Sequence, residues 1–112
     1  MLQFLAAASL QVLGLEFKAA KGSRLNLEQY AVHPVAAIRA LAAIRWAKDP
    51  TVLPIHRAEG LARDADYGVR RDLAKALQSS GAPITDEMRE IIAILRQDVR
   101  RSVRTPALRT AV

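Results

Sequence analysis

The sequence predicts an all-α protein in which antiparallel helix pairs stack into a short, right-handed solenoid. The 112 residues are 51% hydrophobic but only 4% aromatic, and they are rich in alanine, leucine and arginine, which favour helices over strands. An aliphatic residue followed by arginine also returns at nearly even intervals. It stands as Ile38-Arg39, Val69-Arg70 and Val99-Arg100. A period of about thirty positions is typical of repeated helix pairs.

The first long apolar stretch, residues 2–17, has its hydrophobic residues at helical spacing. Glutamine and glutamate side chains interrupt the stretch, and no lysine or arginine precedes Lys18. These features disfavour a membrane span and a secretion signal. We therefore expect a capping helix within residues 1–20, at the start of a single domain over residues 1–112.

Residues 25–48 predict the first helix pair. Asn26 is expected to cap a short helix, because its side-chain oxygen can accept a hydrogen bond from a first-turn amide. The second helix of the pair is expected over residues 34–47, with Pro34 in its first turn. It should end before Pro50, because the residue that precedes a proline is disfavoured in helical geometry.

Residues 51–80 predict the second helix pair. Thr51 is expected to cap its first helix, with Pro54 in the first turn. Residues 64–66, Asp-Ala-Asp, predict a turn into the second helix, and residues 79–83 contain the serine, glycine and proline that mark a loop.

Residues 84–108 predict the third helix pair, with Thr85 or Asp86 as its first cap. The apolar stripe that begins here continues for about five turns. One long helix over residues 86–104 and two helices broken near Asp98 both fit this pattern.

The last helix is expected to end at Pro106, whether residues 86–104 form one helix or two. Residues 105–112 are then predicted to be a frayed tail. This region also concentrates the positive charge of a chain whose formal net charge is +6. After Asp98 the chain has no further acid and carries Arg100, Arg101, Arg104 and Arg109.

Shifting the chain against itself until the three aliphatic-arginine pairs coincide aligns apolar positions with apolar positions. Helix pairs of this kind cannot bury their apolar faces alone and bury them by stacking on their neighbours. Trp46 falls on one of the aligned positions, which favours a place in the core over a binding role. The aligned sets are Ile38, Val69 and Val99; Ala42, Leu73 and Val103; Trp46, Leu77 and Ala107; Leu27, Ala58 and Met88; and Tyr30, Leu61 and Ile91.

The stretch DADYGVRRDLAKAL, residues 64–77, resembles the turn and second helix of HEAT-like repeats of the short, roughly thirty-residue kind. The resemblance covers residues 25–108, with one good copy and two degraded ones. It implies a solenoid of about three repeats. It also implies that Asp64 in the turn and Arg70 of the Val-Arg pair tie adjacent repeats together through hydrogen bonds.

The other two copies depart from this pattern. His33 and Ile94 stand six residues before Arg39 and Arg100, where the central copy has its aspartate. The ladder is therefore predicted for the central repeat alone, and the third copy is either a capping repeat or a long terminal helix. A compact helical bundle whose periodicity arises by chance is the alternative fold.

No catalytic, metal or cofactor site can be assembled from the sequence. The chain has no cysteine, which excludes disulfides and a thiolate zinc site and fits a cytoplasmic protein. His33 and His56 lack the spacing of metal-binding pairs. Asp64, Asp66 and Asp72 form an acidic cluster, but carboxylates at a helix start are explained by the unsatisfied amides there.

The leading functional hypothesis is a non-enzymatic scaffold or adaptor that binds another protein on the concave face of its second helices. The alternative is a protein that binds the nucleic-acid backbone through a basic edge. A homo-oligomer is also open, because few repeats leave apolar ends exposed. The arginines that recur with the repeat and would form the candidate binding edge are Arg39, Arg70, Arg71, Arg100, Arg101 and Arg104.

Overall fold

The computed structural model describes residues 24–111 and is entirely helical over this range, with no strand. The all-α prediction is therefore confirmed for the described part of the chain. The capping helix expected within residues 1–20 lies outside the described residues. The elements are α2 (Arg24–Ala31), α3 (Ala36–Lys48), the 3-10 helix η1 (Pro50–Val52), α4 (Ile55–Ala62), α5 (Tyr67–Ser79), α6 (Asp86–Arg96) and α7 (Arg101–Arg109).

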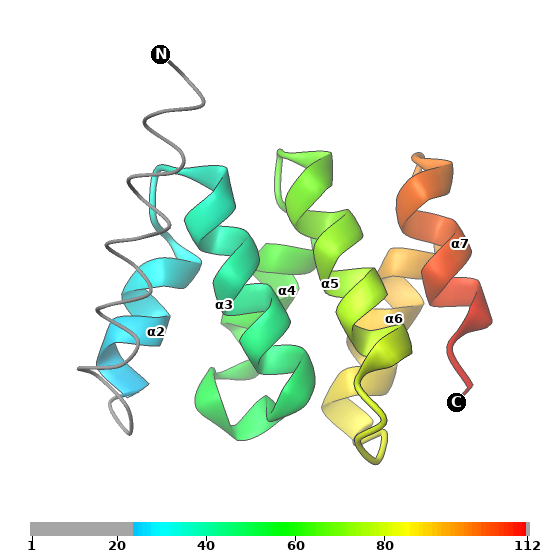
Figure 1. Ribbon diagram of the computed structural model, residues 1–112, viewed down its shortest axis with the longest axis horizontal. Helices are drawn as coiled ribbons and strands as arrows, with labels where there is room; N and C mark the ends of the chain where they lie inside the picture. Colours follow the sequence, from blue (N-terminus) through cyan, green and yellow to red (C-terminus); the bar gives the residue numbers. More distant parts are fainter. Residues whose placement is uncertain (1–23, 112) are drawn as a thin grey trace.

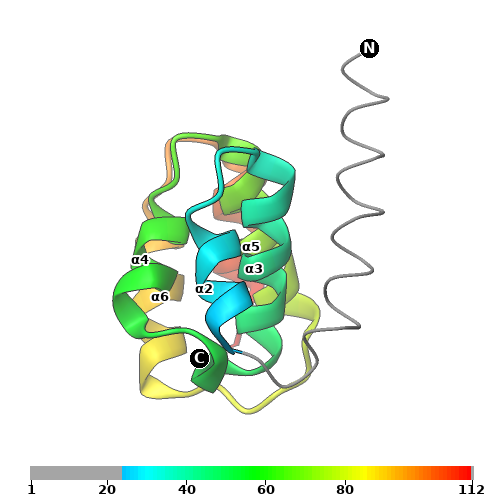
Figure 2. The ribbon, with the colours of Figure 1, turned by 90° about the vertical axis from the view of Figure 1, so that its left-hand side faces the viewer.

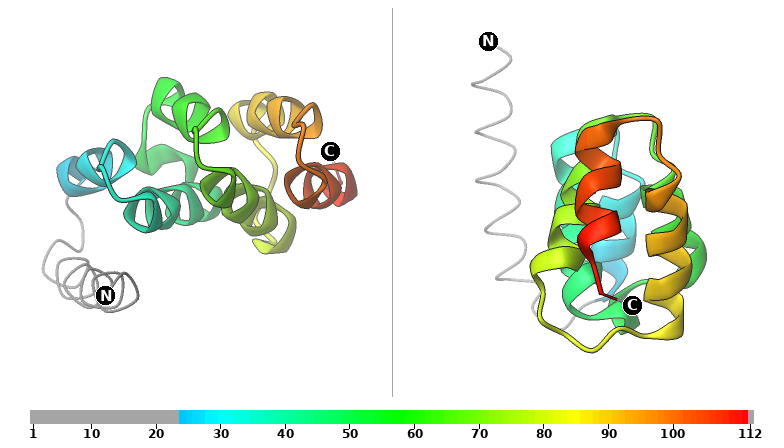
Figure 3. Two further views of the ribbon diagram at one scale, coloured as in Figure 1. Left: turned by 90° about the horizontal axis from the view of Figure 1, so that it is seen from above. Right: turned by 90° about the vertical axis from the view of Figure 1, so that its right-hand side faces the viewer.

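The helices form two layers. Helices α3, α5 and α7 run side by side in one layer, and α2, α4 and α6 form the other layer behind it (Figure 1). The view along the stack shows the same two layers (Figure 2), and the view from above shows how each pair follows the last (Figure 3). The extensive contacts of α5 with both α3 and α7 hold the first of these layers together.

The core lies between the two layers and is built mainly from aliphatic side chains. Leu73, Leu95 and Val103 are fully buried. Trp46 is also buried, with 1% of its surface exposed, and its indole Nε1 has no hydrogen-bond partner among the described residues. The structure therefore places the lone tryptophan in the core, where its ring adds buried apolar surface.

Two predicted helix caps are present. Asp66 caps α5, and its carboxylate accepts a hydrogen bond from the Gly68 backbone N–H at 2.7 Å. Thr85 caps α6, and its hydroxyl oxygen accepts from the Met88 N–H at 3.2 Å. Both side chains satisfy first-turn amides that lack an intrahelical partner.

The caps predicted for the earlier helices are wrong. Helix α2 begins at Arg24, so Asn26 lies inside it, and α3 begins at Ala36, two residues after Pro34. Thr51 belongs to η1, where its N–H and hydroxyl both donate to the Asp49 carboxylate at 3.0 and 2.6 Å. Pro34 and Pro54 thus stand just before α3 and α4, since the fixed φ of proline also fits the extended residues before a first turn.

Residues 86–104 form two helices, because the chain turns between Arg96 and Arg101. Pro106 does not end the second of these, which continues to Arg109 with Pro106 buried inside it. Residues 105–109 of the predicted frayed tail therefore belong to α7. Its end is held by Arg96, which donates to the carbonyl oxygens of Ala107 at 3.0 Å and Thr110 at 2.8 Å.

The third copy of the repeat lies four residues later than its predicted alignment. Val99 is 88% exposed, whereas Val103 is fully buried like Val69. Val103 and the arginine after it are therefore the third Val-Arg pair, in place of Val99 and Arg100. A shift of four residues is close to one helical turn, so both alignments place apolar residues on nearly the same face.

Candidate binding surface

In each of the three helix pairs, a turn of the same form connects the first helix to the second. His33, Asp64 and Asp98 occupy the same position in these turns. Each side chain accepts a hydrogen bond from the backbone N–H two residues later, at 3.0, 2.9 and 2.9 Å respectively. The imidazole of His33 thus accepts the same hydrogen bond that a carboxylate accepts in the other two turns.

An arginine on each following helix reaches back to the same turn. Arg39 donates to the carbonyl oxygen of His33 at 2.8 Å, and Arg104 donates to that of Asp98 at 2.8 Å. Arg70 makes the same hydrogen bond to the carbonyl oxygen of Asp64. These guanidinium groups fix the start of α3, α5 and α7 relative to the turn before each helix.

Two of these arginines also bind the next turn along the chain. Arg39 holds Asp64 with two hydrogen bonds, of 2.7 and 3.0 Å, and Arg70 holds Asp98 at 2.6 Å. The four side chains are largely buried, with exposed fractions of 18%, 8%, 14% and 7% in that order. A planar guanidinium is suited to this forked geometry. The result is a ladder of arginine and aspartate that joins successive helix pairs.

Asp64 and Arg70 both tie adjacent helix pairs together through hydrogen bonds, as the resemblance implied. Asp64 binds Arg39 of the preceding pair, and Arg70 binds Asp98 of the following pair. The extent of the ladder differs from the prediction, which placed it in the central repeat alone. The ladder also reaches the third pair, because Asp98 and Arg104 replace Ile94 and Arg100 in the corrected alignment.

The ladder shifts the ionisation of its first pair. Burial alone would raise the pKa of Asp64. Hydrogen bonds from Arg39 and from the Asp66 backbone, with the charges of Arg39 and Arg70, outweigh it and lower that pKa below its ordinary value. The hydrogen bond to Asp64 in turn raises the pKa of Arg39. Both groups are therefore held in their charged forms.

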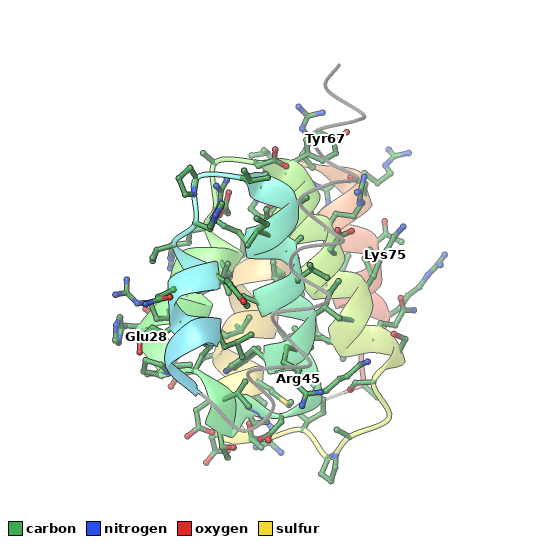
Figure 4. The ribbon with its side chains drawn as sticks, turned by 60° about the vertical axis from the view of Figure 1, so that its left-hand side comes forward. Glu28, Arg45, Tyr67 and Lys75 are labelled. Atoms are coloured by element: carbon green, nitrogen blue, oxygen red, sulfur yellow. The ribbon has the colours of Figure 1, made fainter. Side chains whose placement is uncertain are left out.

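The six arginines predicted to form one basic edge lie at the starts of α3, α5 and α7 and have different contacts. Arg39 and Arg70 are engaged in the ladder and are not available to a ligand. Arg71 and Arg100 flank the ring of Tyr67, with guanidinium carbons 5.7 and 4.4 Å from its centroid. Tyr67, which is 40% exposed, lies at the end of the molecule where the three turns gather (Figure 4).

The positive charge of the described helices is divided unequally between the two layers. Helices α3, α5 and α7 together carry nine lysines and arginines and one acid, whereas α2, α4 and α6 carry four and five. In Figure 4, Lys75 on α5 and Glu28 on α2 project from opposite sides of the molecule. We call the exposed surface of α3, α5 and α7 the basic face.

An open groove of about 430 Å³ lies between α5 and α7 on the basic face. Three cations line it, and they are Lys75, Arg101 and Arg109, together with the polar side chains of Gln78, Ser102 and Thr105. Within the described part of the chain, no carboxylate lines this groove. The neighbouring groove between α3 and α5 shares Lys75 and adds Lys48, and the carboxylate of Asp72 also lines it.

Lys75 and Arg109 were not part of the predicted binding edge. They occupy the same position of successive helix pairs when Val69 is aligned with Val103. The predicted alignment of Val69 with Val99 hides this equivalence. Comparing the charge of the second helices with that of the first helices would have revealed the basic face from the sequence.

The described residues contain no group of three side chains that could hold a metal ion. None of the described helices is long and apolar enough to cross a membrane. Comparisons of the chain with protein-family models, with curated protein sequences and with solved structures found no match.

Proposed function

We propose that this chain is a short solenoid of HEAT-like repeats that serves as a non-enzymatic binding module. The ladder supports this proposal, because the same turn, the same arginine and the same inter-pair contact recur along the stack. A bundle with chance periodicity has no reason to repeat polar contacts at equivalent positions. Repeats of this kind contact only their neighbours and leave extended faces for partners.

The proposed partner is a protein with an acidic surface, and the proposed contact is the basic face. The observation that carries this conclusion is that α3, α5 and α7 together have nine cations and one acid, and that six of these cations lie outside the ladder arginines Arg39, Arg70 and Arg104. Such a surface attracts negative charge and steers an acidic partner toward it. Arg39 and Arg70 bind aspartates in the ladder. Among the described contacts, Lys75, Arg101 and Arg109 form no ion pair, and they line the groove.

Binding to the nucleic-acid backbone is the second candidate, and the groove between α5 and α7 favours it. Three cations without a carboxylate among the described lining residues are sufficient for phosphate contacts, which need charge and no particular motif. Stacking of single-stranded bases is disfavoured on this surface, because Tyr67 is already covered by two guanidinium groups.

Fluorescence anisotropy with two labelled probes separates these candidates. The probes are a polyglutamate peptide and a random-sequence DNA duplex, each titrated with the protein from low to physiological salt. The double variant Lys75→Glu and Arg109→Glu is compared with Arg57→Glu and Arg89→Glu, which changes the net charge equally on the other layer. We expect polyglutamate binding to be lost only in the first variant.

Tight duplex binding with a steep salt dependence, lost in the same variant, would favour the nucleic-acid candidate instead. Equal loss in both variants would show that net charge alone controls binding and would contradict the basic face as a site. An intrinsic hydrolase or transferase activity of the purified protein would contradict the non-enzymatic assignment.

A further inference from the structure

The ladder has one arginine whose carboxylate partner is missing from the described residues. Arg39 and Arg70 each bind an aspartate of the following helix pair. Arg104 occupies the same position on α7, and it donates to the carbonyl oxygens of Asp98 and Val99 at 2.8 and 3.5 Å. No described helix lies beyond α7 in the stack (Figure 1). The side of Arg104 that would receive a carboxylate is therefore open in this part of the chain.

An apolar side chain accompanies this arginine on the same side of α7. Leu108 lies four residues after Arg104, which places both side chains on one helix face. Leu108 is 58% exposed, whereas the equivalent residues of the two preceding helix pairs, Ala43 and Ala74, are fully buried. We call the surface formed by Arg104 and Leu108 the α7 end face.

We propose that the α7 end face docks a further helix pair that presents a carboxylate in the turn between its two helices. The geometry is that of the two ladder contacts already made within this chain, in which an arginine receives an aspartate from the next turn. An isolated exposed ion pair contributes little, but one that is shielded by an apolar neighbour is screened less by salt. Leu108 provides that neighbour.

A second copy of this chain is a poor match for the α7 end face. The first described turn carries His33 in place of the aspartate, and its Nδ1 is already occupied by the Val35 N–H. A head-to-tail copy would therefore offer Arg104 no carboxylate at the ladder position. This inference rests on the ladder and is independent of the basic face, so the two proposals can fail separately.

A tethered helix pair tests the inference. The chain is extended after Arg109 by a copy of residues 76–110, which preserves the spacing between α5 and α6 and supplies a second Asp98 turn. Tethering gives the added pair a high effective concentration at the α7 end face. A double-mutant cycle then combines Arg104→Gln with Asp→Asn in the added turn, and urea unfolding reports their coupling.

We expect the cycle to show coupling of roughly tenfold in the unfolding equilibrium constant, matching a cycle of Arg70→Gln with Asp98→Asn in the unextended chain. The control Arg101→Gln should show no coupling to the added aspartate. An added pair that unfolds independently and does not respond to Arg104→Gln would overturn the proposal, provided that the Arg70 cycle shows its coupling.

Sedimentation equilibrium of the unextended chain supplies the second readout. We expect no self-association that depends on Arg104. A dimer that is lost in Arg104→Glu but retained in Arg101→Glu would assign the α7 end face to a second copy of this chain. It would overturn the assignment to a helix pair with a carboxylate in its turn.

Discussion

At the scale of single residues, the ladder is the feature with the clearest energetic consequence. Arg70 replaces water with two protein partners, the Asp98 carboxylate and the Asp64 carbonyl. Removing one member of a largely buried pair leaves the other without compensation, and that penalty exceeds the worth of the contact itself. The ladder is therefore sensitive to substitution even where a hydrophobic replacement of both members would be tolerated.

We predict that Arg70→Met lowers the free energy of unfolding by about 2 kcal/mol, because Asp98 loses its forked partner in a mostly buried site. Urea unfolding measures this loss. The control is Arg89→Met, which removes a short but exposed pair with Asp86 and should have little effect. Equal effects of the two substitutions would show that the ladder adds nothing beyond a surface contact.

The lowered pKa of Asp64 predicts a dependence of stability on pH. The folded state binds the proton of this carboxyl more weakly than the unfolded chain, where the pKa has its ordinary value of 3.8. The stabilisation is therefore present above that value and is lost as the pH falls through the lowered pKa. Between about pH 5 and about pH 2, we expect stability to fall more steeply in the natural chain than in Asp64→Asn. Parallel curves from urea unfolding would contradict this assignment.

At the scale of helices, the register of α7 distinguishes the structure from the sequence-based alignment. The two alignments exchange the roles of Val99 and Val103. In the structure Val103 is fully buried and Val99 is exposed in the turn.

We predict that Val103→Ala lowers the free energy of unfolding by about 2 kcal/mol, through lost burial and the cavity that remains. Val99→Ala, the same change four residues earlier, should have almost no effect. Thermal or urea unfolding of the two variants checks this. A larger loss for Val99→Ala would restore the alignment of Val99 with Val69 and refute the register of α7.

The helices themselves were largely predictable, because their apolar spacing and the caps Asp66 and Thr85 are local signals. The exact starts of α2, α3 and α4 were not, since proline and asparagine fit positions on either side of a helix start. The end of α7 depends on Arg96, which is distant from it in the sequence, and no local pattern records that contact.

The third copy was misaligned for a physical reason. A displacement of four residues preserves the buried face of a helix, so apolar matching alone cannot separate the two registers. The polar positions do separate them, because Asp98 and Arg104 repeat the spacing of Asp64 and Arg70. The six-residue spacing of aspartate and arginine is therefore the sequence signal that indicates the ladder in the second and third pairs.

At the scale of the whole molecule, the distribution of charge is the property that bears on function. The sequence predicted a basic edge from arginines that recur with the repeat, but two of them stabilise the stack and are unavailable to a partner. The surface that remains is the basic face, whose groove residues Lys75 and Arg109 become equivalent only in the corrected register. The positive charge of the sequence is thus divided between arginines that are engaged in the ladder and cations that are exposed on the basic face.

We propose that the basic face, and not the positive net charge as such, receives an acidic partner. Amide chemical shifts of the full chain, followed by NMR during titration with polyglutamate at physiological salt, distinguish the two. We predict shifts concentrated in α5 and α7 around Lys75, Arg101 and Arg109, with α4 and α6 unchanged. Shifts spread evenly over both layers, or centred on α4 and α6, would contradict the claim.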